Sequence, residues 1–383
     1  MDIPEVTFCT YNYETGKMEP YKTFDNYMSL IWHEYYQEPG DFELYIAATD
    51  NILDEIIPLS FVRIKDHDET MIIEKIELKQ EAGKLDTVII SGRSIIVLLE
   101  CRMIATYYFA FYSTKIGDIL RNVSYNIIIP SPTHPTPDTS FQSNCLFEKK
   151  INGEYVSNTI LDIDSRLDST YLSYYDEFSA TGTNDTFYSR LKDLSTNYDF
   201  GFKTYIDNYD RIHISFYRGN DRSSSQNDYP PVIFSKKFDN LLTFKLKMSN
   251  ENYKTSGLCS NYYDKAGTLE SFDFNASYES GVNKREVFLY IKEDGLDPNL
   301  ASYSVDGLTT YSKNYVANNY PIEYSVESSI DSNNQQFIYG KDYFLGDTVQ
   351  VDGKFGVSTT LICDGVLYSY DTNKIEIVPE FSR

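Results

Sequence analysis

Cysteine is scarce in this sequence, and none of it is arranged in pairs. The 383 residues contain five cysteines, and no two of them have C-x-x-C spacing. An odd number of widely separated cysteines argues against a disulfide framework and against a zinc module, because both need cysteines in matched positions. We therefore expect free thiols and a protein made in a reducing cytoplasm. The five are Cys9, Cys101, Cys145, Cys259 and Cys363.

Basic residues are also few relative to acidic ones. Lys and Arg number 34 against 57 Asp and Glu, which gives a formal net charge of −23. Binding to phosphate backbones is driven by counterion release onto Lys and Arg, so this composition excludes an ordinary nucleic-acid-binding protein. An acidic wall can instead line a passage that nucleic acid crosses without sticking. The same acidity is consistent with solubility alone.

The sequence shows neither an export signal nor a membrane-spanning run. The N-terminus, MDIPEVTFCTYN, contains acidic residues and has the pattern of a strand rather than of a signal peptide. The longest apolar stretches, such as Ile127–Ile129, are far too short to span a bilayer. These features predict a soluble protein without a membrane anchor.

Apolar residues, and tyrosine above all, are plentiful. Hydrophobic residues make up 41% of the chain, with 35 Tyr and 23 Phe, which favours β structure and contact surfaces. The length fits two to three domains. The first hundred residues have the pattern of strands joined by hairpin-sized turns, such as Gln37–Gly40. A short helix is predicted at Ile52–Ile57.

The spacing of apolar residues becomes helical after Gly92 and returns to strands in the last third. A proline-rich stretch at 130–137 fits neither a helix nor a central strand. A β-hairpin is predicted over 200–217, and the polar segment 218–228 is interpreted as a flexible loop. Residues 262–340 have too weak a periodicity for their elements to be placed. The predicted helices are 94–104, 113–127 and 185–198, and the predicted late strands are 232–235, 241–248, 253–259, 285–291, 343–351 and 375–378.

Only four histidines are available as bases for nucleophilic catalysis, which usually needs a His beside an activated Ser or Cys. His33 and His213 lie in predicted strands. His67 lies in the charged hairpin turn Asp66–Glu69, and His134 lies in the proline-rich stretch. The G-x-S-x-G motif of serine hydrolases is absent. We therefore interpret all four as ordinary strand or turn residues and predict no catalytic residue.

Acidic residues are so numerous that a catalytic or metal-binding set can always be drawn. Glycoside hydrolysis needs two carboxylates across a cleft, which sequence spacing cannot show. Asp162, Asp164 and Asp168 begin like a calcium-binding loop. The next ligand position holds Arg166 and the glycine position holds Leu167, so the match fails. Phosphate-binding glycine motifs are also missing. The sequence thus predicts no metal, no cofactor and no enzymatic activity.

Several short motifs occur in a fixed order along nearly the whole chain. The first is a hairpin, W-x-x-Y-Y-x-x-P-G-D-F-E-L, that starts at Trp32. The second is a strand ending in S-G-R, followed by an apolar helix that closes on Arg102. The later motifs are F-S-K-K-F-D-N-L-L from Phe234, L-G-D-T-V from Leu345, G-V-S from Gly356 and I-V-P-E-F from Ile377. This set resembles the baseplate-hub (tail-tip) proteins of siphophages and prophages of Gram-positive bacteria, and the related hubs of phage-derived contractile particles.

The resemblance implies a trimer in which each chain supplies two tube-like β-barrel domains to the end of the tail tube. The expected fold is therefore mainly β with a mixed α/β middle region, assembled into a trimeric ring. The implied function is a structural symmetry adaptor that anchors the tip and lines the exit path of DNA. The implied partners are other copies of the chain, the tail-tube or distal tail ring, a tip, spike or fibre protein, and DNA that passes without specific binding. The implied location is the virion tail tip, after assembly in the host cytoplasm.

These expectations divide the chain near residues 100 and 230. Residues 1–100 are expected to form the N-terminal tube-like β domain, 101–230 a mixed α/β inserted region, and 231–383 the second tube-like β domain with an insertion around 262–340. The chain stops at Arg383, directly after the last hub-like strand. Any hydrolase, spike or fibre is therefore expected on a separate chain.

Two other functions remain open at this point. One is a carbohydrate-binding tail protein whose exposed tyrosines stack on sugars. The other is a peptidoglycan or glycoside hydrolase that acts through an unidentified pair of carboxylates.

Overall fold

In the computed structural model the chain forms two compact units. The first comprises residues 1–242 and 329–383, and the second comprises residues 243–328. No helix among the described residues is long and apolar enough to cross a membrane. The structure describes the whole chain except residues 1–2, 50, 66, 81, 84, 103–107, 111–112, 128–145, 173–177, 181–185, 263–268, 276–279, 292–311, 314, 318, 331–335, 354–355, 372–373 and 383.

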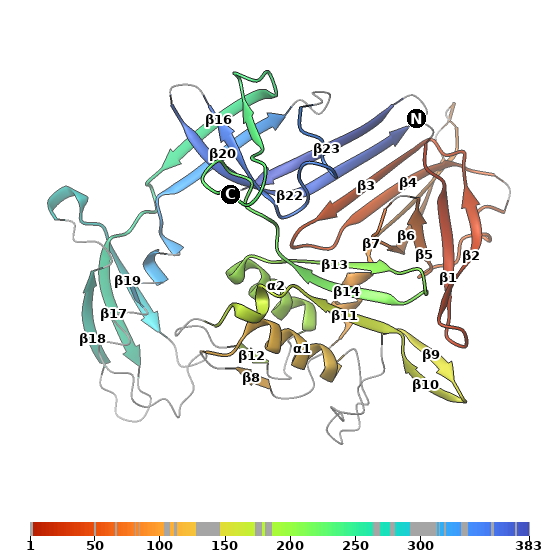
Figure 1. Ribbon diagram of the computed structural model, residues 1–383, viewed down its shortest axis with the longest axis horizontal. Coiled ribbons are helices and arrows are strands. Elements are labelled where there is room, and N and C mark those ends of the chain that lie inside the picture. Colours follow the sequence, from red (N-terminus) through yellow and green to blue (C-terminus); the bar gives the residue numbers. More distant parts are fainter. Residues whose placement is uncertain are drawn as a thin grey trace. The chain divides into compact units, whose positions relative to one another are not determined.

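One 11-stranded sheet forms the frame of the first unit (Figure 1). Its strands run in the order β15-β21-β22-β3-β4-β7-β6-β5-β1-β2, and β23 pairs with β22. Strands from the two ends of the chain therefore meet at the β22–β3 pair. The strands of this main sheet are β1 (Val6–Asn12), β2 (Lys17–Phe24), β3 (Ser29–Tyr35), β4 (Asp41–Ala47), β5 (Phe61–Ile64), β6 (Met71–Lys79), β7 (Thr87–Ser94), β15 (Ile233–Ser235), β21 (Thr348–Asp352), β22 (Ser358–Asp371) and β23 (Ile375–Ser382).

Alternation of side chains buries one face of the main sheet. Leu30 and Trp32 on β3 and Phe42 and Leu44 on β4 are at most 1% exposed. Because residues two apart in a strand share a face, these four side chains point into the same core. Trp32 lies opposite Phe42 in the antiparallel β3–β4 hairpin and opposite Tyr368 of β22. Burial of each large apolar side chain stabilises the fold by about 1.5–3 kcal/mol.

The middle region combines a three-stranded sheet with two α-helices. Strand β11 runs parallel to β14, and β13 and β14 form an antiparallel hairpin. The hydroxyl of Thr186 accepts a hydrogen bond from the Ser189 backbone N–H, which caps the second helix at its start. Figure 1 shows both helices beside this sheet. The elements are η1 (Ile95–Cys101), β8 (Tyr108–Ala110), α1 (Ile116–Ile127), β9 (Glu148–Ile151), β10 (Glu154–Ser157), β11 (Thr159–Ile163), η2 (Leu167–Ser169), β12 (Phe178–Ala180), α2 (Phe187–Tyr198), β13 (Gly201–Ile206) and β14 (Ile212–Tyr217).

A single apolar core joins the middle region to the N-terminal strands. Phe61 of β5 and Ile72 of β6 belong to the same buried cluster as Ile119 of α1, Leu191 of α2 and Phe216 of β14. The 3-10 helix η1 adds apolar side chains to this cluster from the segment that follows β7. The middle region is therefore held on the first strands by removal of apolar surface from water.

The second unit is built on a small mixed sheet. Strand β17 pairs antiparallel with β18 and parallel with β19. Leu289 of β19 and Val316 are buried together. The elements are β17 (Ser256–Tyr262), β18 (Leu269–Asn275), η3 (Gly281–Asn283) and β19 (Glu286–Ile291), and the paired strands β16 (Leu241–Ser249) and β20 (Glu323–Ile330) lead into and out of the unit.

The mainly β fold class is confirmed, as are the predicted hairpin over 200–217 and the free thiols of Cys9, Cys101 and Cys363. The third predicted helix is present as α2, which begins at Phe187. The prediction of a helix over 113–127 was too long, because α1 begins at Ile116.

The helix predicted at Ile52–Ile57 is wrong. Residues 51–55 form a turn instead. Asn51 and Leu59 adopt positive φ angles of 64° and 61°, and Pro58 lacks the N–H that a helix would use. These three residues confine the segment to a compact loop.

Some predictions lie beyond what the structure describes. The proline-rich stretch 130–137, with His134, and Cys145 fall outside the described residues. The domain boundaries near residues 100 and 230 stay predictions. The closed tube-like barrels and the trimer also stay predictions, because in the described residues the main sheet runs from β15 to β2 without a pairing between those two strands.

Candidate functional site

The three aspartates that begin like a calcium loop each contact a different side chain. Asp162 contacts Nδ1 of His213 at 2.7 Å, and Asp164 contacts the Arg166 guanidinium at 2.6 Å. Asp168 pairs with an arginine of α1 at 2.7 Å. In the described part of the chain, no group of three or more His, Cys, Asp or Glu side chains could hold a metal ion. These aspartates therefore serve as hydrogen-bond and ion-pair partners within the fold.

The histidines of the main sheet are also paired with carboxylates. Nδ1 of His33 lies 3.2 Å from a carboxylate oxygen of Asp41. Nδ1 of His67 lies 2.7 Å from a Glu34 oxygen, and its Nε2 lies 2.9 Å from the hydroxyl of Tyr370. Both rings thus connect neighbouring parts of the sheet, in agreement with their interpretation as strand and turn residues.

His213 of β14 lies between two carboxylates. Its Nδ1 contacts Asp162, and its Nε2 lies 3.2 Å from Asp207. Its ring stacks on Tyr205 with the ring centroids 4.4 Å apart. Burial alone would raise the pKa of Asp207, but hydrogen bonds from Arg211 and His213 outweigh burial and hold that pKa well below its usual range. The cluster fixes the β13–β14 hairpin against β11.

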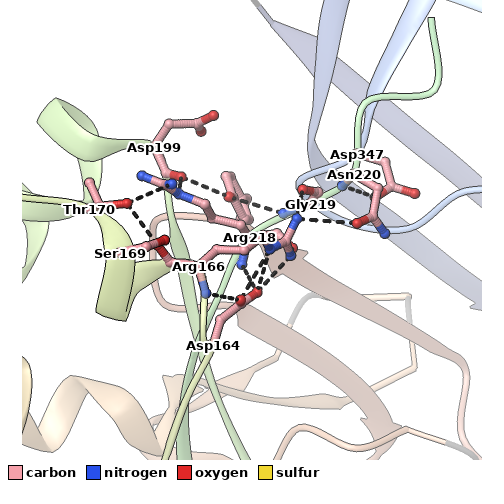
Figure 2. Close-up of polar contacts among 10 residues, drawn as sticks. Asp164, Arg166, Ser169, Thr170, Asp199, Arg218, Gly219, Asn220 and Asp347 are labelled. Carbon is pink, nitrogen blue, oxygen red and sulfur yellow. Dashed lines mark hydrogen bonds and ion pairs between the residues drawn. The ribbon is translucent and has the colours of Figure 1, made fainter. Parts of the chain in front are cut away.

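A group of polar contacts lies where the middle region meets the C-terminal strands (Figure 2). We call it the junction, and its charged members are Asp164, Arg166, Arg218, Arg222 and Asp347. Asp164 follows β11 and accepts hydrogen bonds from the Arg166 backbone N–H at 2.8 Å and from the Arg218 backbone N–H at 3.2 Å. Burial alone would raise the pKa of Asp164, but these hydrogen bonds and the Arg166 guanidinium lower it below its usual value. Asp164 is thus held as an anion.

Arg218 connects the end of β14 to the end of α2. The last carbonyl groups of a helix have no partner within the helix. Arg218 supplies one, because its guanidinium donates to the carbonyl oxygens of Tyr198 and Asp199. A further bond of 3.0 Å goes to the Thr170 hydroxyl. The chain turns at Asp199, which has a φ of 47°. Figure 2 shows Thr170 and Asp199 beside Arg218.

The segment after β14 carries the junction to the C-terminal strands. The Arg166 guanidinium donates to the Gly219 carbonyl oxygen at 2.9 Å. The Asn220 backbone N–H donates to Asp347 at 2.7 Å (Figure 2). Nε of Arg222 lies 2.5 Å from the other oxygen of Asp347, and the two side chains are only 11% and 2% exposed. This ion pair is therefore almost completely removed from water.

Three glycines allow the backbones at the junction to approach closely. A Cβ at Gly219 would lie 1.9 Å from the backbone of Gly346. A Cβ at Gly201 or at Gly346 would overlap the ring of Tyr36 at 2.2–2.4 Å. Tyr36 follows β3, and burial raises the pKa of its hydroxyl. The N-terminal strands, the middle region and the C-terminal strands therefore meet at one side chain.

A buried carboxyl group lies where the middle region packs on the main sheet. Glu69 is 8% exposed, and burial together with the nearby charge of Glu34 raises its pKa to about 8. Ser94 hydrogen-bonds to it, and Lys203 of β13 partly offsets the shift. Nζ of Lys203 also lies 3.5 Å from a carboxylate oxygen of Asp68, the residue before Glu69. The packing of β13 on the main sheet thus encloses an acid that is largely protonated at neutral pH.

Sequence reasoning considered Asp164 and Arg166 only as part of a failed calcium loop and Asp347 only as part of a short motif, and it did not bring the residues of the junction together. It interpreted 218–228 as flexible, whereas this segment is held by hydrogen bonds from Asn220 and Arg222 to Asp347 and from Ser224 to Gln350. The signal available was the clustering of Arg, Gly and Asn directly after a strand. Asp164 pairs with Arg166, Asp347 pairs with Arg222, and Arg218 hydrogen-bonds to carbonyl oxygens, so the arrangement is suited to fixing the relative position of chain segments.

Comparison with known proteins places this fold among tail proteins. A 43 kDa tail protein of prophage MuSo2 from Shewanella oneidensis is similar to this chain with a TM-score of 0.55 and 12% identity, over 100% of this chain and 98% of that one. The prophage tail protein gp18 from Listeria monocytogenes EGD-e is similar with a TM-score of 0.50 and 12% identity, over 99% and 93% of the two chains.

A chain in the half-lidded PdpA–VgrG complex from Francisella also shares the fold. The TM-score is 0.50 at 10% identity, and the match covers 99% of this chain but 58% of that one. At such identities the likeness shows the fold alone. No curated protein matches the sequence.

The family is shown by the sequence itself. The model of the family described as Siphovirus ReqiPepy6 Gp37-like protein matches residues 15–381, which is nearly the whole chain. The resemblance to siphophage and prophage tail proteins is thus confirmed. The chain belongs to the family of Siphovirus ReqiPepy6 Gp37-like proteins.

Proposed function

We propose that the protein is a structural hub at the tip of a phage or phage-like tail. Three copies form a ring that joins the end of the tail tube to the tip and lines the exit path of the DNA. Family membership and the likeness to prophage tail proteins support a tail component. The observation that carries the proposal is a row of side chains with two carboxylates on the face of the main sheet opposite the buried core.

One row of side chains on the second face of the main sheet contains two carboxylates. Glu43, Ile31, Ser369 and Glu376 are paired in turn across β4, β3, β22 and β23, so they form one row. Directly paired residues share a face, and this row alternates with the buried row that contains Trp32. Its four members are all partly exposed. A wall of like charge repels passing phosphates instead of arresting them.

The N-terminal and C-terminal strands pair with each other in one sheet. Two neighbouring tube domains that form one wall would pair in the same way. We keep residues 1–100 and 231–383 as these two domains, with the insertion around 262–340, and 101–230 as the inserted middle region. The continuous pairing from β4 through β3 and β22 to β23 supports this assignment. In the assembly, the partners are two further copies, the tail-tube or distal tail ring, and a tip, spike or fibre protein. The ring is assembled in the bacterial cytoplasm and remains at the virion tail tip.

We also propose that the chain has no enzymatic activity. Several charged groups of the described region that could serve as acids or bases are engaged with one another. Examples are His213 between Asp162 and Asp207, and Arg222 with Asp347. Hydrolysis of peptidoglycan by the purified chain would contradict this part of the proposal.

Native mass measurement of the purified chain tests the assembly. The proposal predicts a species of three times the mass of one chain, alone or after addition of the purified tail-tube protein of the same particle. A single-chain mass under both conditions would contradict it.

A further inference from the structure

The loop between β4 and β5 is apolar on both of its sides. Ile52 and Ile56 are 6% and 3% exposed and anchor the loop in the core of the first unit. Leu53, Ile57 and Leu59 lie on its outer side and are 45%, 44% and 69% exposed. Exposed apolar side chains that lie close together are typical of surfaces that are covered by a partner. The fold covers only the inner side of this loop.

Hydrogen bonds hold the loop in place. The Tyr21 hydroxyl accepts from the Ile57 backbone N–H at 3.1 Å and bonds the Ser60 hydroxyl at 2.8 Å. The Leu59 backbone N–H donates to the Ile73 carbonyl oxygen at 3.2 Å. The exposed side chains are therefore presented on a preorganised backbone, which lowers the entropic cost of binding.

Leu59 is held outward at a conformational cost. Its φ of 61° lies in the left-handed region, which side chains as large as leucine rarely adopt. Strain of this kind persists where the surrounding structure enforces it, and it concentrates at functional surfaces. A strained and exposed leucine indicates that the side chain has a use outside the isolated chain.

The charge around the loop decides what kind of partner it fits. Asp54 is exposed within the loop, and Glu55 is paired with Lys22 of β2 at 2.6 Å. The chain as a whole carries a formal net charge of −23. The same loop of a second copy would bring another exposed Asp54 against this surface, whereas a partner with a neutral or basic rim would not.

We propose that Leu53, Ile57, Pro58 and Leu59 form the docking surface for a different protein of the tail, which presents an apolar pocket with a neutral or basic rim. This inference rests on the proposed function, because it assigns the seat of the adjoining tail ring to one loop of the hub. Leu59 is the anchor of the surface. Apolar anchors in desolvated pockets carry most of the affinity of such contacts.

The test compares Leu59→Gly with Asn51→Gly. Both replace a residue at positive φ in the same loop, but only the first removes an exposed apolar side chain. The probe is the purified tail-tube protein of the same particle, and the readouts are its affinity for the chain and the mass of the chain alone. Leu59→Gly is expected to keep or raise the melting temperature, since glycine relieves the strain, while it weakens binding about tenfold or more. Asn51→Gly is expected to leave both the melting temperature and the affinity for the tail-tube protein unchanged.

Each other outcome overturns a specific part of the account. If the wild-type chain forms trimers and Leu59→Gly binds the tail-tube protein as tightly as wild type does, the docking surface is wrong. Wild-type trimers that do not bind the probe overturn the docking surface and leave the hub standing. Loss of self-assembly by Leu59→Gly means that the surface belongs to a contact between copies, which overturns the assignment to a different protein. A wild-type chain that neither assembles nor binds overturns the proposed function and this inference with it.

Discussion

The middle region is attached to the two ends of the chain by contrasting means. Toward the N-terminal strands the contact is an apolar core, with Leu191 of α2 and Phe216 of β14 in one cluster with Phe61 and Ile72. Toward the C-terminal strands the contact is the junction, with a buried ion pair and backbones that pack directly on each other. One attachment depends on volume and the other on charge and exact geometry.

The contrast has a physical consequence for tolerance to change. An apolar contact keeps most of its strength when one side chain is replaced by another of similar volume. A buried ion pair does not, because removal of one partner leaves the other charge in a poorly hydrated site. A joint that must hold one orientation within a ring is better served by the second kind. The following predictions set the two attachments against each other.

Removal of the buried carboxylate should have the largest effect. Asp347→Ala leaves Arg222 without its partner and is expected to lower the free energy of unfolding by about 4 kcal/mol. Urea denaturation with and without the substitution measures this. The matched control is Glu38→Ala, which breaks the exposed Lys192–Glu38 contact and should change stability by less than about 1 kcal/mol. Equal effects of the two substitutions would show that the junction is not a buried charge pair.

Substitution of Gly219 should reduce stability almost as much, because the backbone packs closely there. Gly219→Ala places a Cβ 1.9 Å from the Gly346 backbone, so the two segments must separate, at an expected cost of about 3 kcal/mol. Gly153→Ala serves as the control, because that glycine has a positive φ but open space around its Cβ position. It should cost only about 1 kcal/mol from backbone strain. A cost at Gly219 no greater than that at Gly153 would contradict the close approach.

The apolar attachment should distinguish loss of volume from change of shape. Leu191 is 1% exposed, so Leu191→Ala is expected to cost about 2–3 kcal/mol, whereas Leu191→Met should cost less than about 1.5 kcal/mol. Thermal unfolding of both variants provides the measurement. If methionine were as damaging as alanine, the supposed difference between the two attachments would disappear.

A rise in pH should weaken the packing around Glu69, which lies on the side of the apolar attachment. The pKa of this carboxyl is raised from 4.5 to about 8 in the folded protein, so its contribution is fully present below about pH 4.5 and is lost as the pH rises through about 8. Glu69→Gln removes the titration. The variant should gain stability relative to wild type between pH 5 and 9, with little difference near pH 4. A stability difference that does not change over this range would show that Glu69 is not buried as an acid.

The sequence predicted those elements whose signals are local. The β3–β4 hairpin has alternating apolar residues and a Pro-Gly turn, and both were sufficient to place it. Strand β22 was missed although it is the longest in the sheet, because its apolar alternation is interrupted at Asp364-Gly365, where the pairing with β23 also shifts. Ile52 and Ile56 have helical spacing, but positive φ angles at Asn51 and Leu59 override it.

The junction could not be predicted because most of its contacts join distant segments, and only the Asp164–Arg166 pair is local. Asp164, Arg218 and Asp347 lie in three distant parts of the sequence, and each alone looks like an ordinary polar residue after or before a strand. Only the folded arrangement brings their charges together. The domain boundaries are hard to predict for a similar reason, since β3 and β22 come from opposite ends of the chain and pair in one sheet.

Imaging of the purified chain by negative-stain electron microscopy tests the central claim most directly. The account predicts class averages with three-fold symmetry and a central hole, either for the chain alone or after addition of the tail-tube protein. Compact particles without symmetry under both conditions would contradict the hub and would make sugar binding the next function to test.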